Sequence, residues 1–173
     1  MTQKNMVPNG DFSTGDFSEW IPQGYDTPMS VERHNGSYAA RLVGGRNQGQ
    51  SLATKTFHIQ PGVFAFSSRI QAPNAAPLQD TKDRRIHIPV LGKTPNPMFH
   101  AHIYCTLWTT NRNTGEHEVW PEVRYVDPQT RTLTLKGTIR PGYEWLSVHF
   151  AIPNDPFGNK GHYLISKVWF SVV

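Results

Sequence analysis

The stretch Asn5-Met6-Val7-Pro8-Asn9-Gly10-Asp11-Phe12, followed by Gly15 and Trp20, decides the fold of this chain. Asn9-Gly10 tolerates positive φ angles without strain, so a tight turn is predicted after a short apolar entry. Phe12 and Trp20 place two large apolar side chains close to that turn. We therefore expect the chain to open with a turn that aromatic side chains anchor.

The composition indicates an all-β protein. At 173 residues, the chain is expected to form one domain over 1–173 with a sizeable core. It contains 14 Gly and 14 Pro, so turns must be frequent, as in a sandwich of many short strands. Aromatic residues make up 12% and charged residues only 17%. A surface rich in aromatic groups and poor in charge suits stacking on neutral ligands.

Charge and targeting signals exclude several classes of function. The formal net charge is +4, yet the longest basic run is Arg84-Arg85, so no stripe typical of nucleic-acid binding is present. No apolar run is long enough to span a membrane. One cysteine, Cys105, forbids an internal disulfide and fits a reducing compartment. The start Met-Thr-Gln-Lys-Asn-Met lacks an apolar signal region, which predicts a cytoplasmic protein, release without a cleaved signal, or a trimmed chain.

Alternating apolar and polar residues predict about eight or nine strands. The expected ranges are 37–43, 50–59, 63–70, 101–109, 118–126, 130–139, 145–152 and 163–172. Pro61-Gly62 predicts that 50–59 and 63–70 form a hairpin. The polar, Pro-rich segment 72–99 predicts a long loop or insertion with at most a short strand over 85–91, which either shapes a site or decorates the fold. Together these ranges predict a two-sheet antiparallel β-sandwich of jelly-roll type.

The order of these features resembles the jelly-roll carbohydrate-binding modules of the family 4, 9 and 22 type, within the galactose-binding-like sandwiches. The resemblance rests on the opening stretch and Trp20, and then on Gly36 to Leu42, Gln50-Ser51-Leu52, Pro61-Gly62, Val63 to Phe66 and Phe150-Ala151-Ile152-Pro153. It implies non-covalent binding of a glycan, and a structural calcium site between the opening loop and the last strand.

Two residues depart from the calcium pattern that the resemblance implies. Ser13 follows Phe12, and Lys167 occupies the final strand, where acidic side chains would be expected. Asp11 and Asp16 remain as candidate calcium ligands. We therefore expect no well-formed calcium site.

The strand expected over 101–109 carries the leading candidates for ligand binding. Its apolar face, which includes Cys105, belongs to the core, while His102, Tyr104 and Trp108 share the other face. Tyr104 and Trp108 would lie about 13 Å apart and form a stacking platform, unless the 72–99 segment covers them. The alternation also places the thiol of Cys105 in the core, as an inert group.

The strand expected over 118–126 adds Trp120, Glu122 and Arg124, with Trp120 expected to be exposed among charges. A carboxylate and a guanidinium beside an aromatic ring suit the recognition of sugar hydroxyls. The alternative is a solvated strand face with cross-strand ion pairs. Arg69 is a further binding candidate of the same kind.

Metal-dependent or nucleophilic catalysis finds less support. His100-Ala101-His102 resembles the His-x-His of cupins, but no Glu follows at the expected spacing, so two surface histidines are the alternative. No nucleophile motif or phosphate-binding loop appears, and we expect no enzyme activity and no cofactor. The leading hypothesis is a lectin-like module for a carbohydrate ligand. The alternatives are a protein-interaction subunit of a toxin, phage-tail or surface assembly, which includes self-association, and a cupin-like metal enzyme.

Overall fold

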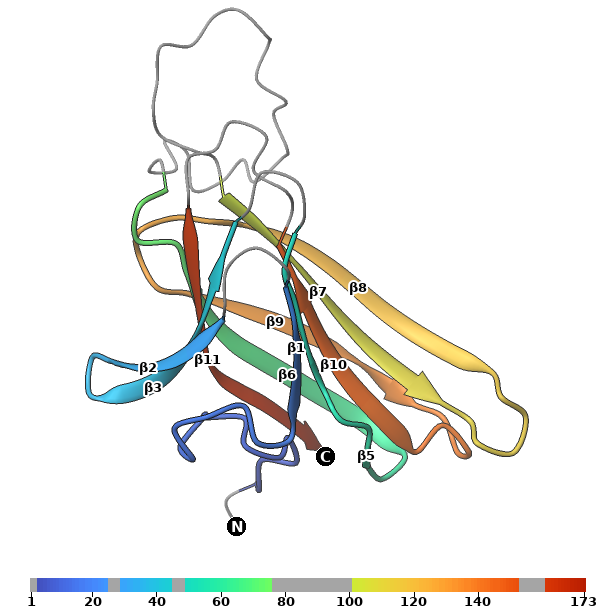
Figure 1. The fold of residues 1–173 in the computed structure, drawn as a ribbon. Helices are drawn as coiled ribbons and strands as arrows, with labels where there is room; N and C mark the ends of the chain where they lie inside the picture. The colour runs from blue at the N-terminus through green and yellow to red at the C-terminus, as the bar shows by residue number, and fades with distance from the viewer. Residues whose placement is uncertain (1–2, 25–28, 45–48, 76–100, 153–160) are drawn as a thin grey trace, which may run out of the picture.

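A computed structural model describes residues 3–24, 29–44, 49–75, 101–152 and 161–173, and these residues form two antiparallel sheets (Figure 1). Sheet A consists of β1 (Trp20–Gln23), β4 (Ser51–Thr54), β5 (Phe57–His58), β7 (Ala101–Thr110), β8 (His117–Val126) and β10 (Trp145–Ala151). Sheet B consists of β2 (Ser30–His34), β3 (Ser37–Val43), β6 (Gly62–Gln71), β9 (Arg131–Ile139) and β11 (His162–Val172).

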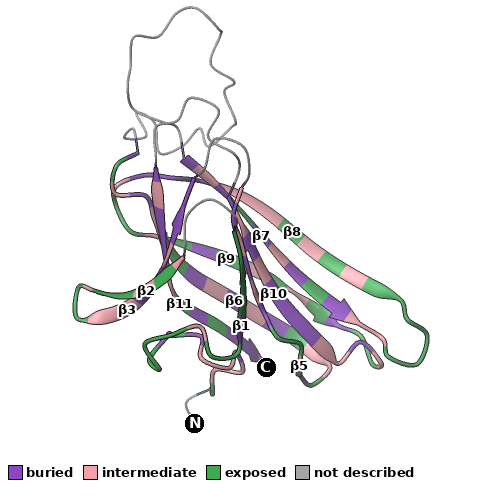
Figure 2. Ribbon diagram, in the orientation of Figure 1, coloured by how far each residue is buried: buried purple, intermediate pink, exposed green. Residues whose placement is uncertain are grey.

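Strand order confirms the two-sheet antiparallel sandwich of jelly-roll type. The order is β1-β4-β10-β7-β8 in sheet A, with β5 also paired to β10, and β2-β3-β11-β6-β9 in sheet B. Buried positions alternate with more exposed ones along β6 and β7 (Figure 2). One face of each sheet therefore points inward, and the two inner faces pack against each other. At this contact the ring centroids of Phe66 in sheet B and Phe150 in sheet A lie 6.5 Å apart.

The opening stretch forms the predicted turn, and its aromatic residues enter the core. Phe12 is fully buried and stacks on Trp20 with ring centroids 5.0 Å apart, while the Trp20 indole N–H donates to the Asn9 carbonyl at 2.9 Å. Asn9 takes the positive φ of 50°. Gly10 has a different role: it lets the backbone of the opening turn approach the backbone of β11. A Cβ at this position would overlap the carbonyl oxygen of Val168.

The predicted hairpin between 50–59 and 63–70 is wrong. β4 pairs with β1 and β5 pairs with β10, all in sheet A, whereas β6 pairs with β11 in sheet B. The Pro61-Gly62 turn therefore carries the chain from one sheet to the other, which local turn chemistry alone does not reveal.

Of the predicted loop over 72–99, the structure describes only residues 72–75, which follow the end of β6 at Gln71. Ala72 is fully buried and Ala75 is 2% exposed, and both belong to the core. The rest of that segment, with the strand expected over 85–91, lies outside the described residues.

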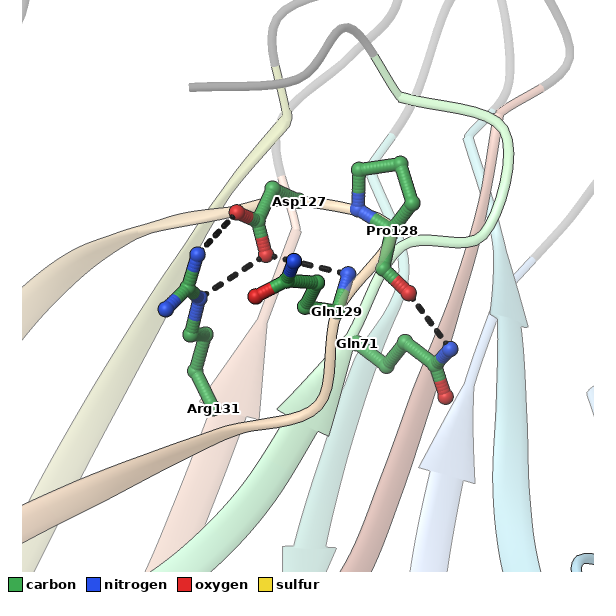
Figure 3. A network of polar contacts seen from close by, with 5 residues as sticks. All are labelled: Gln71, Asp127, Pro128, Gln129 and Arg131. Atoms are coloured by element: carbon green, nitrogen blue, oxygen red, sulfur yellow. Dashed lines mark hydrogen bonds and ion pairs between the residues drawn. The ribbon is translucent and has the colours of Figure 1, made fainter. Parts of the chain in front are cut away.

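A network of polar contacts holds the loop through which β8 of sheet A leads into β9 of sheet B (Figure 3). The buried carboxylate of Asp127 accepts two hydrogen bonds from Arg131, at 3.0 and 2.6 Å, and one from the Gln129 backbone N–H. Gln71, at the end of β6, donates to the Pro128 carbonyl at 2.7 Å. This network fixes one end of the sandwich, where the chain crosses between the sheets.

Candidate functional site

A groove of about 480 Å³ lies on the outer face of sheet A. Five strands contribute to it, from the edge strand β1 through β4, β10 and β7 to β8, and the short β4–β5 connection adds Thr56. The lining consists of small, hydroxyl-bearing, aromatic and imidazole side chains: Ile21, Gln23, Ser51, Ala53, Thr54, Thr56, Trp108, Thr110, His117, Ser147 and His149. Among the described residues, no acidic and no permanently cationic side chain lines the groove.

Trp108 is the large aromatic residue of the groove. The alternation of β7 turns it outward, and it is 39% exposed. Its indole N–H donates to His117 Nδ1 at 2.8 Å, and its ring centroid lies 5.0 Å from that of His117 and 6.2 Å from that of His149. Because its single donor is occupied, Trp108 offers a ligand only its ring. The two histidines hold that ring in a fixed orientation.

Hydrogen bonds assign the tautomers of both histidines. His117 Nδ1 accepts from Trp108, so in the neutral ring the proton lies on Nε2. The hydroxyl of Ser147 donates to the Thr54 carbonyl at 3.0 Å and must therefore accept from His149 Nε2, 2.9 Å away. His149 is left with Nδ1 as an acceptor, and burial lowers its pKa, which keeps the ring neutral. The groove thus combines one imidazole donor and one imidazole acceptor around an aromatic ring.

Two of the predicted binding residues share the outer face of sheet A with Trp108. Tyr104 is 41% exposed, as the alternation of β7 predicts, and its ring lies 5.3 Å from that of His102. Both side chains lie nearer the start of β7 and do not line the groove. The proposed platform therefore extends beyond the groove along the same strand.

Three other predicted binding residues lie on the opposite face of this sheet. Trp120 pairs with Leu107 in register and so points inward, where its ring packs edge-on against Phe64 at 5.3 Å. The expectation of an exposed Trp120 is wrong, because this edge of the sandwich is closed by its indole. Glu122 and Arg124 share that inner face at the edge of the sheet and pair with each other.

Arg69 lies in a third place. It pairs in register with Ser166 on the outer face of sheet B and is exposed. The predicted set is thus divided among three surfaces, and His102, Tyr104 and Trp108 share the outer face of sheet A that bears the groove.

Of the candidate metal ligands, Asp11 and Asp16 are engaged in turns, His102 lies on β7, and His100 lies outside the described part of the chain. Asp11 accepts from the Ser13 backbone N–H, and Asp16 accepts from Thr14 and Ser18. These hydrogen bonds lower the pKa of Asp16. No group of three or more His, Cys, Asp or Glu side chains that could hold a metal occurs among the described residues, which exclude His100. Cys105 is fully buried as predicted, and burial raises the pKa of its thiol.

The sequence analysis missed His117, His149 and the β1 residues Ile21 and Gln23. His149 and Ser147 alternate with Leu146, Val148 and Phe150 on a predicted strand, so their outward face could have been found from that pattern. Its position beside Trp108 depends on the pairing of β10 with β7, which a single sequence does not give.

Comparison with known proteins supports the fold. No family model and no curated protein matches the sequence. Among solved structures, tailspike protein 4 of bacteriophage CBA120 (enzymatically active domain) is similar with a TM-score of 0.67 and 13% identity over 98% of this chain, which spans 21% of that protein. TmCBM61, solved with β-1,4-galactotriose, is similar with a TM-score of 0.64 and 12% identity, over 98% of this chain and 99% of that module.

A third similar structure is the CBM22-1–GH10 part of Clostridium thermocellum xylanase 10B, solved with xylohexaose. Its TM-score is 0.63 at 10% identity, over 97% of this chain and 28% of that one.

None of the described residues forms a helix that could cross a membrane. The chain has the jelly-roll β-sandwich fold found in carbohydrate-binding modules.

Proposed function

We propose that this protein binds an uncharged glycan non-covalently in the groove of sheet A. The observation that carries the proposal is Trp108, an exposed indole held between two histidines in a groove lined by hydroxyl groups. A sugar ring presents an apolar face for stacking and a rim of hydroxyls. The ring of Trp108 can stack on the apolar face of the sugar. The hydroxyl rim can form hydrogen bonds with His117, His149 and the Ser and Thr hydroxyls of the groove.

The extent of the groove favours an oligosaccharide over a single sugar. β1 and β8 are separated by four strand spacings, which is about 19 Å. The neutral lining favours an uncharged chain, since no side chain there would compensate a carboxylate or sulfate.

The same lining supports binding rather than hydrolysis. Glycoside hydrolases use a pair of carboxyl groups beside the scissile bond, and no Asp or Glu of the described ranges lines the groove. We infer a module that holds its ligand without making or breaking bonds.

Isothermal titration calorimetry tests this proposal with β-1,4-galactotriose and xylohexaose as first probes, followed by a wider array of neutral glycans. Trp108→Ala should weaken binding about 5- to 150-fold, because loss of a central aromatic contact commonly costs about 1–3 kcal/mol. Trp169→Ala is the matched control, since it removes an equally exposed indole from the opposite face of the sandwich. Equal affinity of wild type and Trp108→Ala, or no ligand in the array, would contradict the proposal.

The similarity to a phage tailspike favours a second candidate, a subunit that assembles with other protein chains. Light scattering coupled to size-exclusion chromatography separates the two, because a stable assembly would give a mass above that of one chain. A monomer without partners would argue against this candidate.

A further inference from the structure

A second exposed tryptophan lies on the outer face of sheet B. Trp169 of β11 pairs in register with Ser67 of β6 and is 38% exposed. The register shifts between Ser166 and Trp169, where Lys167 adopts a positive φ of 47°. This bulge directs both an indole and an extra cation toward solvent on the central strand of the sheet.

The three strands around Trp169 carry positive charge without any acidic residue. β11, β6 and β9 contain no Asp or Glu, although they contain Lys167, Arg69 and Lys136, all exposed. None of these three cations forms an ion pair with another described residue. The fourth cation of these strands, Arg131, is engaged with Asp127. Three of the chain's 17 Lys and Arg side chains therefore lie on this side of the sandwich without an acidic residue in the same strands.

The register brings a cation beside the indole. Arg69 pairs with Ser166, and Ser67 pairs with Trp169, so Arg69 and Trp169 lie on adjacent strands one pair apart, on either side of the bulge. Hydroxyl side chains surround them on the same face, with Ser67 opposite Thr134 in the adjacent strand. A ring for stacking, a forked donor and several hydroxyls thus occur together on the outer face of sheet B.

We propose that this face of sheet B is a second binding surface, and that its ligand is an anionic polysaccharide whose sugar rings bear carboxylate or sulfate groups. One sugar ring stacks on Trp169, and its anionic group accepts from the guanidinium of Arg69. Lys136 and Lys167 attract the anionic groups of the neighbouring sugars in the polysaccharide. The surface is separate from the groove of sheet A, so this proposal holds or fails independently of the first.

Charge complementarity selects this ligand over an uncharged one. An uncharged glycan gains nothing from three cations, whereas a polyanion gains from each of them at low ionic strength. The groove of sheet A, with its uncharged lining, shows the opposite preference.

The test is titration of the full chain with polygalacturonate, with dextran sulfate and with uncharged dextran. The first two polymers distinguish carboxylate from sulfate recognition, and the third controls for uncharged sugar. Trp169→Ala and Arg69→Ala should each weaken polyanion binding at least fivefold. Two control variants should leave the affinity for the polyanion within twofold of wild type. They are Lys55→Ala, which removes an exposed cation from the β4–β5 connection, and Trp108→Ala. Binding should also weaken at about 0.5 M NaCl.

Three results would overturn the proposal: no binding of either polyanion, an equal loss in Lys55→Ala, or unchanged affinity in Trp169→Ala. Loss in Trp108→Ala would place the polyanion in the groove and would likewise contradict a second surface. Thermal unfolding confirms that each variant is folded. If Trp169→Ala does not fold, Arg69→Ala and Lys136→Ala decide the outcome against Lys55→Ala.

Discussion

Gly10→Ala should destabilise the protein strongly, because the opening turn touches β11 through backbone atoms. A Cβ at Gly10 would lie under 3.0 Å from the Val168 carbonyl oxygen, a distance that real Cβ atoms essentially never show. Relief of this overlap must lengthen two hydrogen bonds, from Val168 N–H to the Gly10 carbonyl and from the Asn5 side chain to the Val168 carbonyl, each 2.9 Å.

The magnitude follows from these contacts. Two weakened hydrogen bonds cost about 2 kcal/mol, and overpacking adds about 1–3 kcal/mol. The smaller backbone freedom of alanine in the unfolded chain returns about 0.5–1 kcal/mol. The net loss is therefore about 3 kcal/mol, which lowers Tm by about 6–12 °C for a chain of this size.

Urea and thermal unfolding followed by circular dichroism measure this change. Gly36→Ala is the control, since a Cβ there meets no atom within 4 Å and only its positive φ of 79° is strained. Gly10→Ala should therefore be clearly less stable than Gly36→Ala. If Gly10→Ala unfolds within 1 kcal/mol of wild type, the close approach to β11 does not fix the opening turn.

Three further predictions concern the core, the crossing between sheets and pH. Gly137→Ala should cost about 1–2 kcal/mol in urea unfolding, because its Cβ would meet the buried ring of Phe64 at 2.7 Å; unchanged stability would contradict tight packing at this edge. Arg131→Met should cost about 3 kcal/mol, because it leaves the buried carboxylate of Asp127 unpaired, and a loss below 1 kcal/mol would show that this carboxylate stays solvated. Burial lowers the pKa of His149 below 6.5, so as pH falls the unfolded chain takes up this proton before the folded chain does. The free energy of unfolding that His149 contributes is therefore complete above pH 6.5 and declines as pH falls toward the folded-state pKa. Thermal scans should show this decline in wild type and a smaller one in His149→Gln, and identical pH profiles of the two proteins would refute the prediction.

Much of the fold could be predicted from the sequence because its long strands alternate cleanly. The residues of β7 alternate between buried positions and more exposed ones at every step, and the opening turn is marked by Asn9-Gly10 with Phe12 and Trp20. The short edge strands β1 and β2 were not predicted. Three of the four residues of β1 are exposed, so it lacks the alternation that reveals a half-buried strand.

The errors arose where pairing between distant segments overrides local pattern. Pro61-Gly62 has the chemistry of a hairpin turn, yet β5 pairs with β10 and β6 with β11. Trp120 lies among charged residues in sequence, but its register with Leu107 directs it against the core.

The candidate site was predictable only in part for the same reason. Alternation alone places Tyr104 and Trp108 on one outward face. The histidines that hold Trp108 come from β8 and β10, and only the register of three strands brings them together.

The most direct test of glycan binding in the groove follows the indole N–H signals by ¹⁵N-correlated NMR during titration with a neutral oligosaccharide. The chain contains five tryptophans, and the Trp108 signal is assigned by its loss in Trp108→Ala. Because that N–H is hydrogen-bonded to His117 beneath the proposed ligand, its signal should move in a saturable way while the Trp169 signal stays in place. A glycan that binds without moving the Trp108 signal would show that the groove of sheet A is not the binding site.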